Sequence, residues 1–130
     1  MKNIFFSSSK YLFYFSFIFL LILYLFPGSL IGYFLYGNFG KQPDFISNPI
    51  GTSINHLIFF FFLSILGFIF RKNQKKLINS FSFLFLISII LELLHYLIPN
   101  RAFELNDLYA NSLGVLMAYF IFKILKKFKN

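Results

Sequence analysis

Apolar residues of this chain gather into four long runs, and polar and charged residues collect in the segments between them. Apolar runs of this length with scarcely any charge predict helices that span a membrane. We expect the spans at about residues 11–27, 54–70, 77–98 and 108–122. The sequence therefore predicts an all-α membrane protein, a small bundle of four transmembrane helices that forms a single domain over residues 1–130.

The segment between the first two spans is of a different kind. Pro27 and Gly28 interrupt the apolar pattern, and the apolar run that follows, residues 30–36, is too short to cross a membrane. This run fits either an interfacial or a re-entrant helix, and the Gly, Pro and Asn residues of 37–53 predict a loop. The Lys-bearing leader before the first span is also typical of a signal peptide. No A-x-A-like site follows it, so we expect the first helix to be retained.

Composition supports the membrane interpretation. Hydrophobic residues make up 58% of the chain and charged residues 12%, whereas soluble proteins contain about 25% charged residues. The net charge of +8 is compatible with a nucleic-acid partner. The positive charges follow the loops rather than one continuous face, so we expect no nucleic acid to bind. The absence of cysteine excludes disulfides and thiolate metal sites.

The loop charges also predict an orientation. Ten of the twelve Lys and Arg residues lie before the first span, between the second and third, or after the fourth: Lys2, Lys10, Arg71, Lys72, Lys75, Lys76, Lys123, Lys126, Lys127 and Lys129. Only Lys41 and Arg101 lie in the other connections. Because positive loops stay on the cytoplasmic side, we expect a multi-pass protein of the cell membrane with both termini in the cytoplasm.

Residues 92–114 carry most of the chemistry that the chain offers. Three of its four acidic residues lie in this stretch, among otherwise apolar segments. Ionisable groups in membrane-type sequence are costly, so they usually mark a site. The expected topology brings these groups and the start of the second span to a similar depth, near the extracytoplasmic boundary. The candidate polar site is therefore made of His56, Glu92, His95, Arg101, Asp107 and Asn111.

The spacing of these residues leaves several pairings open. Glu92, His95 and Tyr96 are spaced to share one helix face, which we expect to turn into the bundle. Glu92 then pairs with Arg101 or hydrogen-bonds across the bundle to Asn111.

The roles of the individual site residues are also open. Arg101 either clamps Glu104 or Asp107, or holds a phosphate or carboxylate at the membrane surface. Asp107 is expected to cap the N-terminus of the fourth span rather than to catalyse a reaction. His56 and His95 also fit interfacial residues that hydrogen-bond loop carbonyls.

Metal binding is the weaker alternative for this set. Glu92 and His95 form an E-x-x-H pair, but bundles that bind metal through such pairs use a second helix of the same kind, and none occurs here. A mixed site of His56, His95, Glu92 and Asp107 is the remaining candidate. We favour the expectation of no metal ion and no other cofactor.

Small residues predict close contacts between helices. Ala110, Gly114 and Ala118 recur every four residues along the last span, and Gly67 lies within the second. Stripes of this kind let two helix backbones approach each other. We therefore assign these four residues to helix packing.

The spacing within the candidate site resembles the signature of the VanZ-like family. That signature is similar to E-x-x-Q, then an Arg, then D-x-x-x-N-x-x-G, and it is matched here by Glu92, His95, Arg101, Asp107, Asn111 and Gly114. His95 stands where the family usually has Gln. The family often has an Asp–Lys pair shortly before a His at a helix start, whereas Thr52 and Ser53 precede His56 in this chain.

The resemblance implies a small integral membrane protein, and VanZ-like proteins are associated with resistance to teicoplanin-type glycopeptides. As partners we expect membrane lipid and an anionic head group or lipid-linked envelope precursor, bound at the extracytoplasmic polar site. The alternative is an enzyme of lipid-linked intermediates, with Glu92 or Asp107 as general base and His95 as acid or proton shuttle. We favour binding over catalysis and assign no catalytic residue, and the sequence indicates no oligomeric state.

Overall fold

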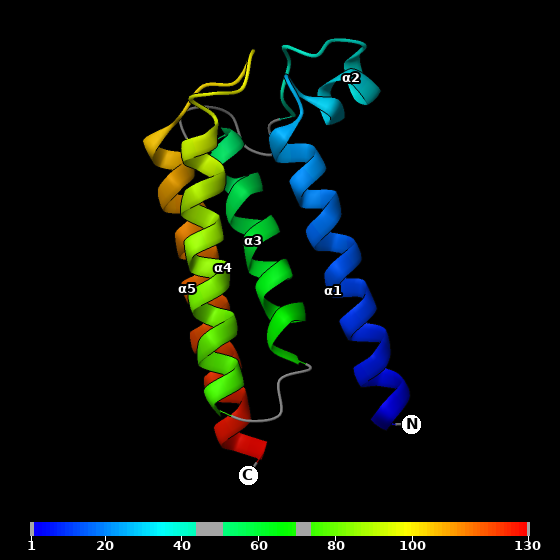
Figure 1. The fold of residues 1–130 in the computed structure, drawn as a ribbon, viewed down its shortest axis with the longest axis vertical. Helices are drawn as coiled ribbons and strands as arrows, with labels where there is room; N and C mark the ends of the chain where they lie inside the picture. Colours follow the sequence, from blue (N-terminus) through cyan, green and yellow to red (C-terminus); the bar gives the residue numbers. More distant parts are fainter. Residues whose placement is uncertain (1, 44–50, 70–73, 130) are drawn as a thin grey trace.

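The computed structural model describes residues 2–43, 51–69 and 74–129, and every regular element in these ranges is a helix (Figure 1). The elements are α1 (Lys2–Leu25), α2 (Leu30–Tyr36), α3 (Gly51–Ile69), α4 (Gln74–Leu94) and α5 (Leu105–Lys129). The predicted all-α class is therefore confirmed for the described part of the chain. Part of the expected loop, residues 44–50, and part of the basic loop, residues 70–73, lie outside the described residues.

Three of these helices are long and apolar enough to cross a membrane. The qualifying stretches are Ser7–Leu25 in α1, Lys75–Leu94 in α4 and Leu105–Phe128 in α5. The expected fourth span falls on α3, whose apolar stretch Ser53–Ile69 is shorter than the other three. Its 17 residues rise about 26 Å, a little less than the ~30 Å hydrocarbon core of a bilayer. A fourth crossing therefore stays a prediction.

The four long helices run side by side, with α3 at the centre. Figure 1 shows α3 between α1 on one side and α4 with α5 on the other, and α3 packs most extensively against α5. The core between them is apolar and includes Leu20, Phe60, Leu84 and Val115. Many large apolar side chains, Phe15 and Phe62 among them, point outward instead. A continuous apolar exterior of this kind suits lipid rather than water.

The two ends of the bundle differ. Both termini lie at one end in Figure 1, while α2 and the connection between α4 and α5 lie at the other. At that end Ser29 caps α2 by accepting a hydrogen bond from the Gly32 amide at 2.9 Å. A Cβ added at Gly32 would lie 1.6 Å from the Lys41 carbonyl oxygen, so only glycine allows the loop after α2 to fold back against it. The short helix and its loop thus form one compact unit beside the end of α1.

The structure corrects two expectations about helix ends. α4 ends at Leu94, because the amides of the next three residues bond to carbonyls three rather than four residues back. This tighter turn directs Tyr96 outward, 69% exposed and stacked on Phe103, so Tyr96 does not share the inward face of Glu92 and His95. α5 begins at Leu105, three residues earlier than expected. Asp107 therefore lies inside the first turn of α5 and is not its cap.

The residues assigned to helix packing lie where helices approach most closely. A Cβ added at Gly114 would lie 2.5 Å from the Leu57 carbonyl oxygen and 3.0 Å from the Phe61 amide nitrogen. Ala110 and Ala118 are buried on the same side of α5. Gly67 is similarly close to the Phe13 ring, on α1. The approach of α5 to α3 thus involves backbone atoms, which cannot move aside as a flexible side chain can.

We expect Gly114→Ala to lower the stability of the bundle, because the added methyl group must push α3 away from α5. Overpacking of this kind costs about 1–3 kcal/mol. The measurement is the midpoint of thermal unfolding in detergent, with Leu113→Ala on the exposed face of the same helix as the control. Equal midpoints for Gly114→Ala and the unchanged protein would contradict the close approach.

Candidate functional site

Polar side chains from four helices meet near the end of the bundle that carries α2. Tyr24 comes from α1, His56 from α3, Glu92 from α4, and Asp107 and Asn111 from α5. Glu92 and Asn111 are fully buried, and Asp107 and Tyr24 nearly so. Residues that the sequence separates by up to 87 positions are thus in direct contact. Such a concentration of polar groups inside an apolar bundle requires that each group find a partner.

Asn111 is the junction of a hydrogen-bond chain. Its amide nitrogen donates to Glu92 Oε2 at 3.2 Å and to the Ser88 carbonyl at 3.5 Å. Both partners are acceptors, so the orientation of the side-chain amide follows from them. Its oxygen then accepts from the Tyr24 hydroxyl at 2.7 Å, and the same hydroxyl lies 2.8 Å from His56 Nδ1.

Glu92 is held by donors rather than by a salt bridge to arginine. Besides the Asn111 bond, its Oε1 lies 3.2 Å from His95 Nδ1 and accepts from the Glu104 amide at 3.3 Å. Of the two alternatives left open for this residue, the geometry therefore selects the hydrogen bond to Asn111. A buried carboxylate is stabilised when several hydrogen-bond donors surround it, as they surround Glu92.

Asp107 connects α5 to α3. One of its oxygens, Oδ1, accepts a hydrogen bond from the Ser53 hydroxyl at 2.5 Å. The other oxygen, Oδ2, lies 3.6 Å from His56 Nε2. His56 is therefore flanked by two carboxylates, because its Nδ1 also lies 3.8 Å from Glu92 Oε2.

Arg101 makes different contacts from those expected. Its guanidinium donates to the carbonyls of Leu23, at 2.5 Å, and Phe26, at 3.3 Å, where α1 ends. Carbonyls at a helix C-terminus lack partners within the helix, and a cation there is favourable. Among the described residues no ion pair joins Arg101 to Glu92, Glu104 or Asp107, so the expected acidic clamp was wrong.

The pKa values of Arg101 and Glu104, the two charged residues of the α4–α5 connection, are shifted by their surroundings. Burial lowers the pKa of Arg101 from its ordinary value, while the nearby Tyr24, Glu92 and Asp107 act in the opposite direction. Arginine stays protonated nonetheless. Partial burial, and then the charges of Asp107 and Glu92, raise the pKa of Glu104.

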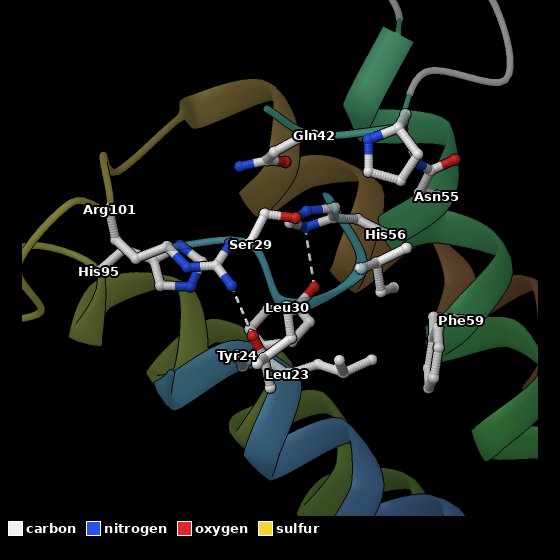
Figure 2. Close-up of a pocket in the computed structure, with 12 residues that line it drawn as sticks. Leu23, Tyr24, Ser29, Leu30, Gln42, Asn55, His56, Phe59, His95 and Arg101 are labelled. Atoms are coloured by element: carbon white, nitrogen blue, oxygen red, sulfur yellow. Dashed lines mark hydrogen bonds between the residues drawn. The ribbon is translucent and has the colours of Figure 1, made fainter. Parts of the chain in front are cut away.

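A small cavity of about 80 Å³ opens beside this cluster (Figure 2). It has room for several water molecules or for a group of a few heavy atoms. Its polar lining comes from Tyr24, Ser29, Gln42, Asn55, His56, His95 and Arg101. The cavity thus joins α1, the loop after α2, α3 and the α4–α5 connection.

Two buried atoms of the cavity wall have no hydrogen-bond partner among the described residues. His95 is 3% exposed and its ring stacks on Tyr24, yet its Nε2 has no partner. Asn55 donates to the Pro43 carbonyl at 2.6 Å, but its Oδ1 accepts nothing. Buried polar atoms in native proteins are normally satisfied, so these two atoms call for a ligand or water.

The structure brings together five of the six candidate site residues, namely His56, Glu92, His95, Asp107 and Asn111, and it places Arg101 on the wall of the adjoining cavity. Sequence reasoning missed Tyr24 and Ser53. Tyr24 falls within the apolar run of the first span and was not singled out. The available signal was its hydroxyl, because a tyrosine within a span needs a polar partner.

Comparison with known proteins agrees with the resemblance seen in the site residues. The model of the family described as VanZ/LLP1 matches residues 3–126. Searches of curated proteins and of solved structures find no significant match. Family membership and the long apolar helices fit a small membrane protein. Because the family match covers nearly the whole sequence and includes every residue of the polar cluster, this chain belongs to the VanZ/LLP1 family.

Proposed function

We propose that the protein crosses the cell membrane four times, through α1, α3, α4 and α5, with both termini in the cytoplasm. The support is the distribution of charge along the sequence, since ten of the twelve Lys and Arg residues lie before the first span, between the second and the third, or after the fourth. The short α3 can serve as a span because it is apolar and surrounded by the other three long helices. The polar cluster and its cavity then lie near the extracytoplasmic surface.

The function that we propose is binding of an anionic head group, such as the phosphate of a lipid or of a lipid-linked envelope precursor. The observation that carries this proposal is the cavity whose lining includes both Arg101 and His95, the residue whose buried Nε2 has no partner. A guanidinium has five N–H groups, and the carbonyls of Leu23 and Phe26 engage two of them. The remaining N–H groups suit a phosphate.

The charge balance favours a small anionic group over a larger acidic ligand. Glu92 and Asp107 lie behind the cavity wall, and neither lines the cavity itself. Arg101 places a positive charge on the lining of the cavity, where it also holds the end of α1. Its partial burial strengthens the attraction, since the effective dielectric constant there is below that of water.

Catalysis is the second candidate, and the contact between Glu92 and His95 favours it. The 3.2 Å distance joins a carboxylate to the imidazole of His95, a residue that lines the cavity. An enzyme would use this pair to move a proton to or from a head group. The same family membership allows a link to glycopeptide resistance, which we propose only as a phenotype to be tested.

The proposed topology predicts which positions a membrane-impermeant reagent reaches. The chain contains no cysteine, so single substitutions give an unambiguous label. We expect Lys41→Cys to react with a charged maleimide on intact cells, and Lys127→Cys to react only after the cells are opened. Labelling of Lys127→Cys on intact cells would overturn the orientation.

Head-group binding predicts a loss of affinity when the guanidinium is replaced. Arg101→Lys keeps the charge but removes the planar fork, and a hydrogen bond to a charged group contributes about 1.5–3 kcal/mol. We therefore expect at least about tenfold weaker binding of a short-chain phosphatidylglycerol in detergent, measured by thermophoresis. Because Arg101 also holds the end of α1, the unfolding midpoint is measured in parallel. The control is Lys41→Ala, which removes a positive charge from the loop after α2, where Lys41 covers the Tyr36 ring. Equal loss in the control would indicate unspecific attraction.

Glu92→Gln separates binding from catalysis. The substitution keeps the shape of the side chain and removes the base. An enzyme that uses Glu92 should lose turnover of a lipid-linked phosphate by about 10²–10⁴ and still bind it. A binding protein should keep most of its affinity and any glycopeptide-resistance phenotype, while Arg101→Ala loses both. Complete loss in both variants, with normal expression and monodispersity, would contradict the binding proposal.

A further inference from the structure

The polar cluster contains two buried carboxylates with no lysine or arginine beside them. Within the part of the chain that the structure describes, the ion pairs of Glu92 and Asp107 are all with histidines. The nearest arginine, Arg101, directs its N–H groups to the carbonyls of α1 instead. Two carboxylates buried in an apolar bundle, both adjacent to His56, need a positive centre between them.

The hydrogen-bond chain determines which nitrogen of His56 carries the proton. The Asn111 amide donates to Glu92 and Ser88, so its oxygen must accept. The single Tyr24 proton is therefore given to Asn111, and the Tyr24 oxygen is left to accept from His56 Nδ1. With the proton of the neutral imidazole on Nδ1, the lone pair of Nε2 points away from Tyr24.

That lone pair faces another acceptor. His56 Nε2 lies 3.6 Å from Asp107 Oδ2, while the Ser53 hydroxyl donates to the other Asp107 oxygen. A proton shared between Nε2 and the carboxylate would make a charge-assisted bond of about 2.7–2.9 Å. Two atoms bound to one tetrahedral metal at about 2.1 Å are instead roughly 3.4 Å apart. The observed separation is close to the second value.

We propose that His56, Glu92 and Asp107 bind a divalent transition-metal ion of the Zn²⁺ class, with Nε2 of His56 and one oxygen of each carboxylate as ligands. One ligand atom from each of the three residues lies within 4.8 Å of the others, so the three side chains already converge on one point. The three ligands come from α3, α4 and α5, one from each helix. Imidazole together with carboxylate is a ligand set that Zn²⁺ and its neighbours accept.

Each of the three residues already has the partner that orients a metal ligand. Tyr24 accepts from the non-ligating nitrogen of His56, Asn111 donates to Glu92, and Ser53 donates to Asp107. Partners of this kind orient the ligands and raise metal affinity.

The ion would offset both buried negative charges and join α3 to α4 and α5. Three protein ligands leave at least one coordination position for water or a ligand atom. His56, one of the three ligands, also lines the cavity. The inference rests on the cluster itself and does not depend on the head-group proposal.

The test is a metal titration of protein purified without a polyhistidine tag, stripped with a chelator and then dialysed. We expect Zn²⁺ to bind at about one ion per chain by calorimetry and elemental analysis, and to raise the unfolding midpoint, since a ligand of the native state stabilises it. Asp107→Asn keeps the size of the ligand and removes its charge, and should lower the Zn²⁺ affinity at least about 100-fold. Tyr24→Phe removes only the orienting hydroxyl and should lower it about 10–100-fold.

The matched control is Ser64→Ala, which changes another buried polar residue of α3 and leaves all three ligands and their orienting partners in place. Its Zn²⁺ affinity should equal that of the unchanged protein. The proposal is overturned if the stripped protein binds no ion stoichiometrically, which would leave a proton on His56 as the positive centre. It is equally overturned if Asp107→Asn and Tyr24→Phe, both folded, bind Zn²⁺ as well as the control does. Should Asp107→Asn fail to fold, Tyr24→Phe alone decides.

Discussion

Burial of two carboxylates inside an apolar helical bundle is the constraint on which the rest of this structure depends. Glu92 and Asp107 have almost no contact with solvent, and a charge in such a place is tolerated only when donors or cations surround it. Glu92 is surrounded by the side-chain amide of Asn111, the backbone amide of Glu104 and the imidazole of His95. Asp107 accepts from the Ser53 hydroxyl and lies beside His56. These partners come from α3, α5 and the connection between α4 and α5, and α1 joins the network through Tyr24.

This network explains why α1 belongs to the bundle despite its few contacts with α4. Tyr24 reaches across to Asn111 and His56, and its ring stacks on His95. From the other side, Arg101 holds the last carbonyls of α1. The polar end of the bundle is therefore linked by directional bonds, whereas the rest of the bundle is held by apolar packing around residues such as Phe60 and Leu84.

Close backbone packing and the polar network reinforce each other along α3 and α5. Gly114 brings the two helices together one turn below Asn111, which sets the distance at which His56 faces Asp107. The cavity forms beside this contact, where α1 ends and the loop after α2 crosses the bundle. Both proposals made for this site depend on that arrangement. The head-group proposal uses the residues that line the cavity, and the metal proposal uses His56, Glu92 and Asp107.

The sequence by itself determined the helical class, the position of the polar stretch and the family, because each depends on local pattern and spacing. It also identified Glu92 and His95 as inward-facing, since residues three positions apart share one face of a helix. It could not show that α4 ends at Leu94 and turns Tyr96 outward, because the tighter turn has no distinct pattern of residues.

Only the tertiary structure decided the partners. Arg101 selects carbonyls rather than carboxylates because α1, far away in sequence, ends beside it. Tyr24 becomes part of the site because the packing of α1 brings its hydroxyl to Asn111. The packing of α3 against α5 likewise brings His56 Nε2 to face Asp107. Spacing along one helix reveals which residues share a face. The residue that stands opposite is set by how separate helices pack, and no local pattern in the chain records it.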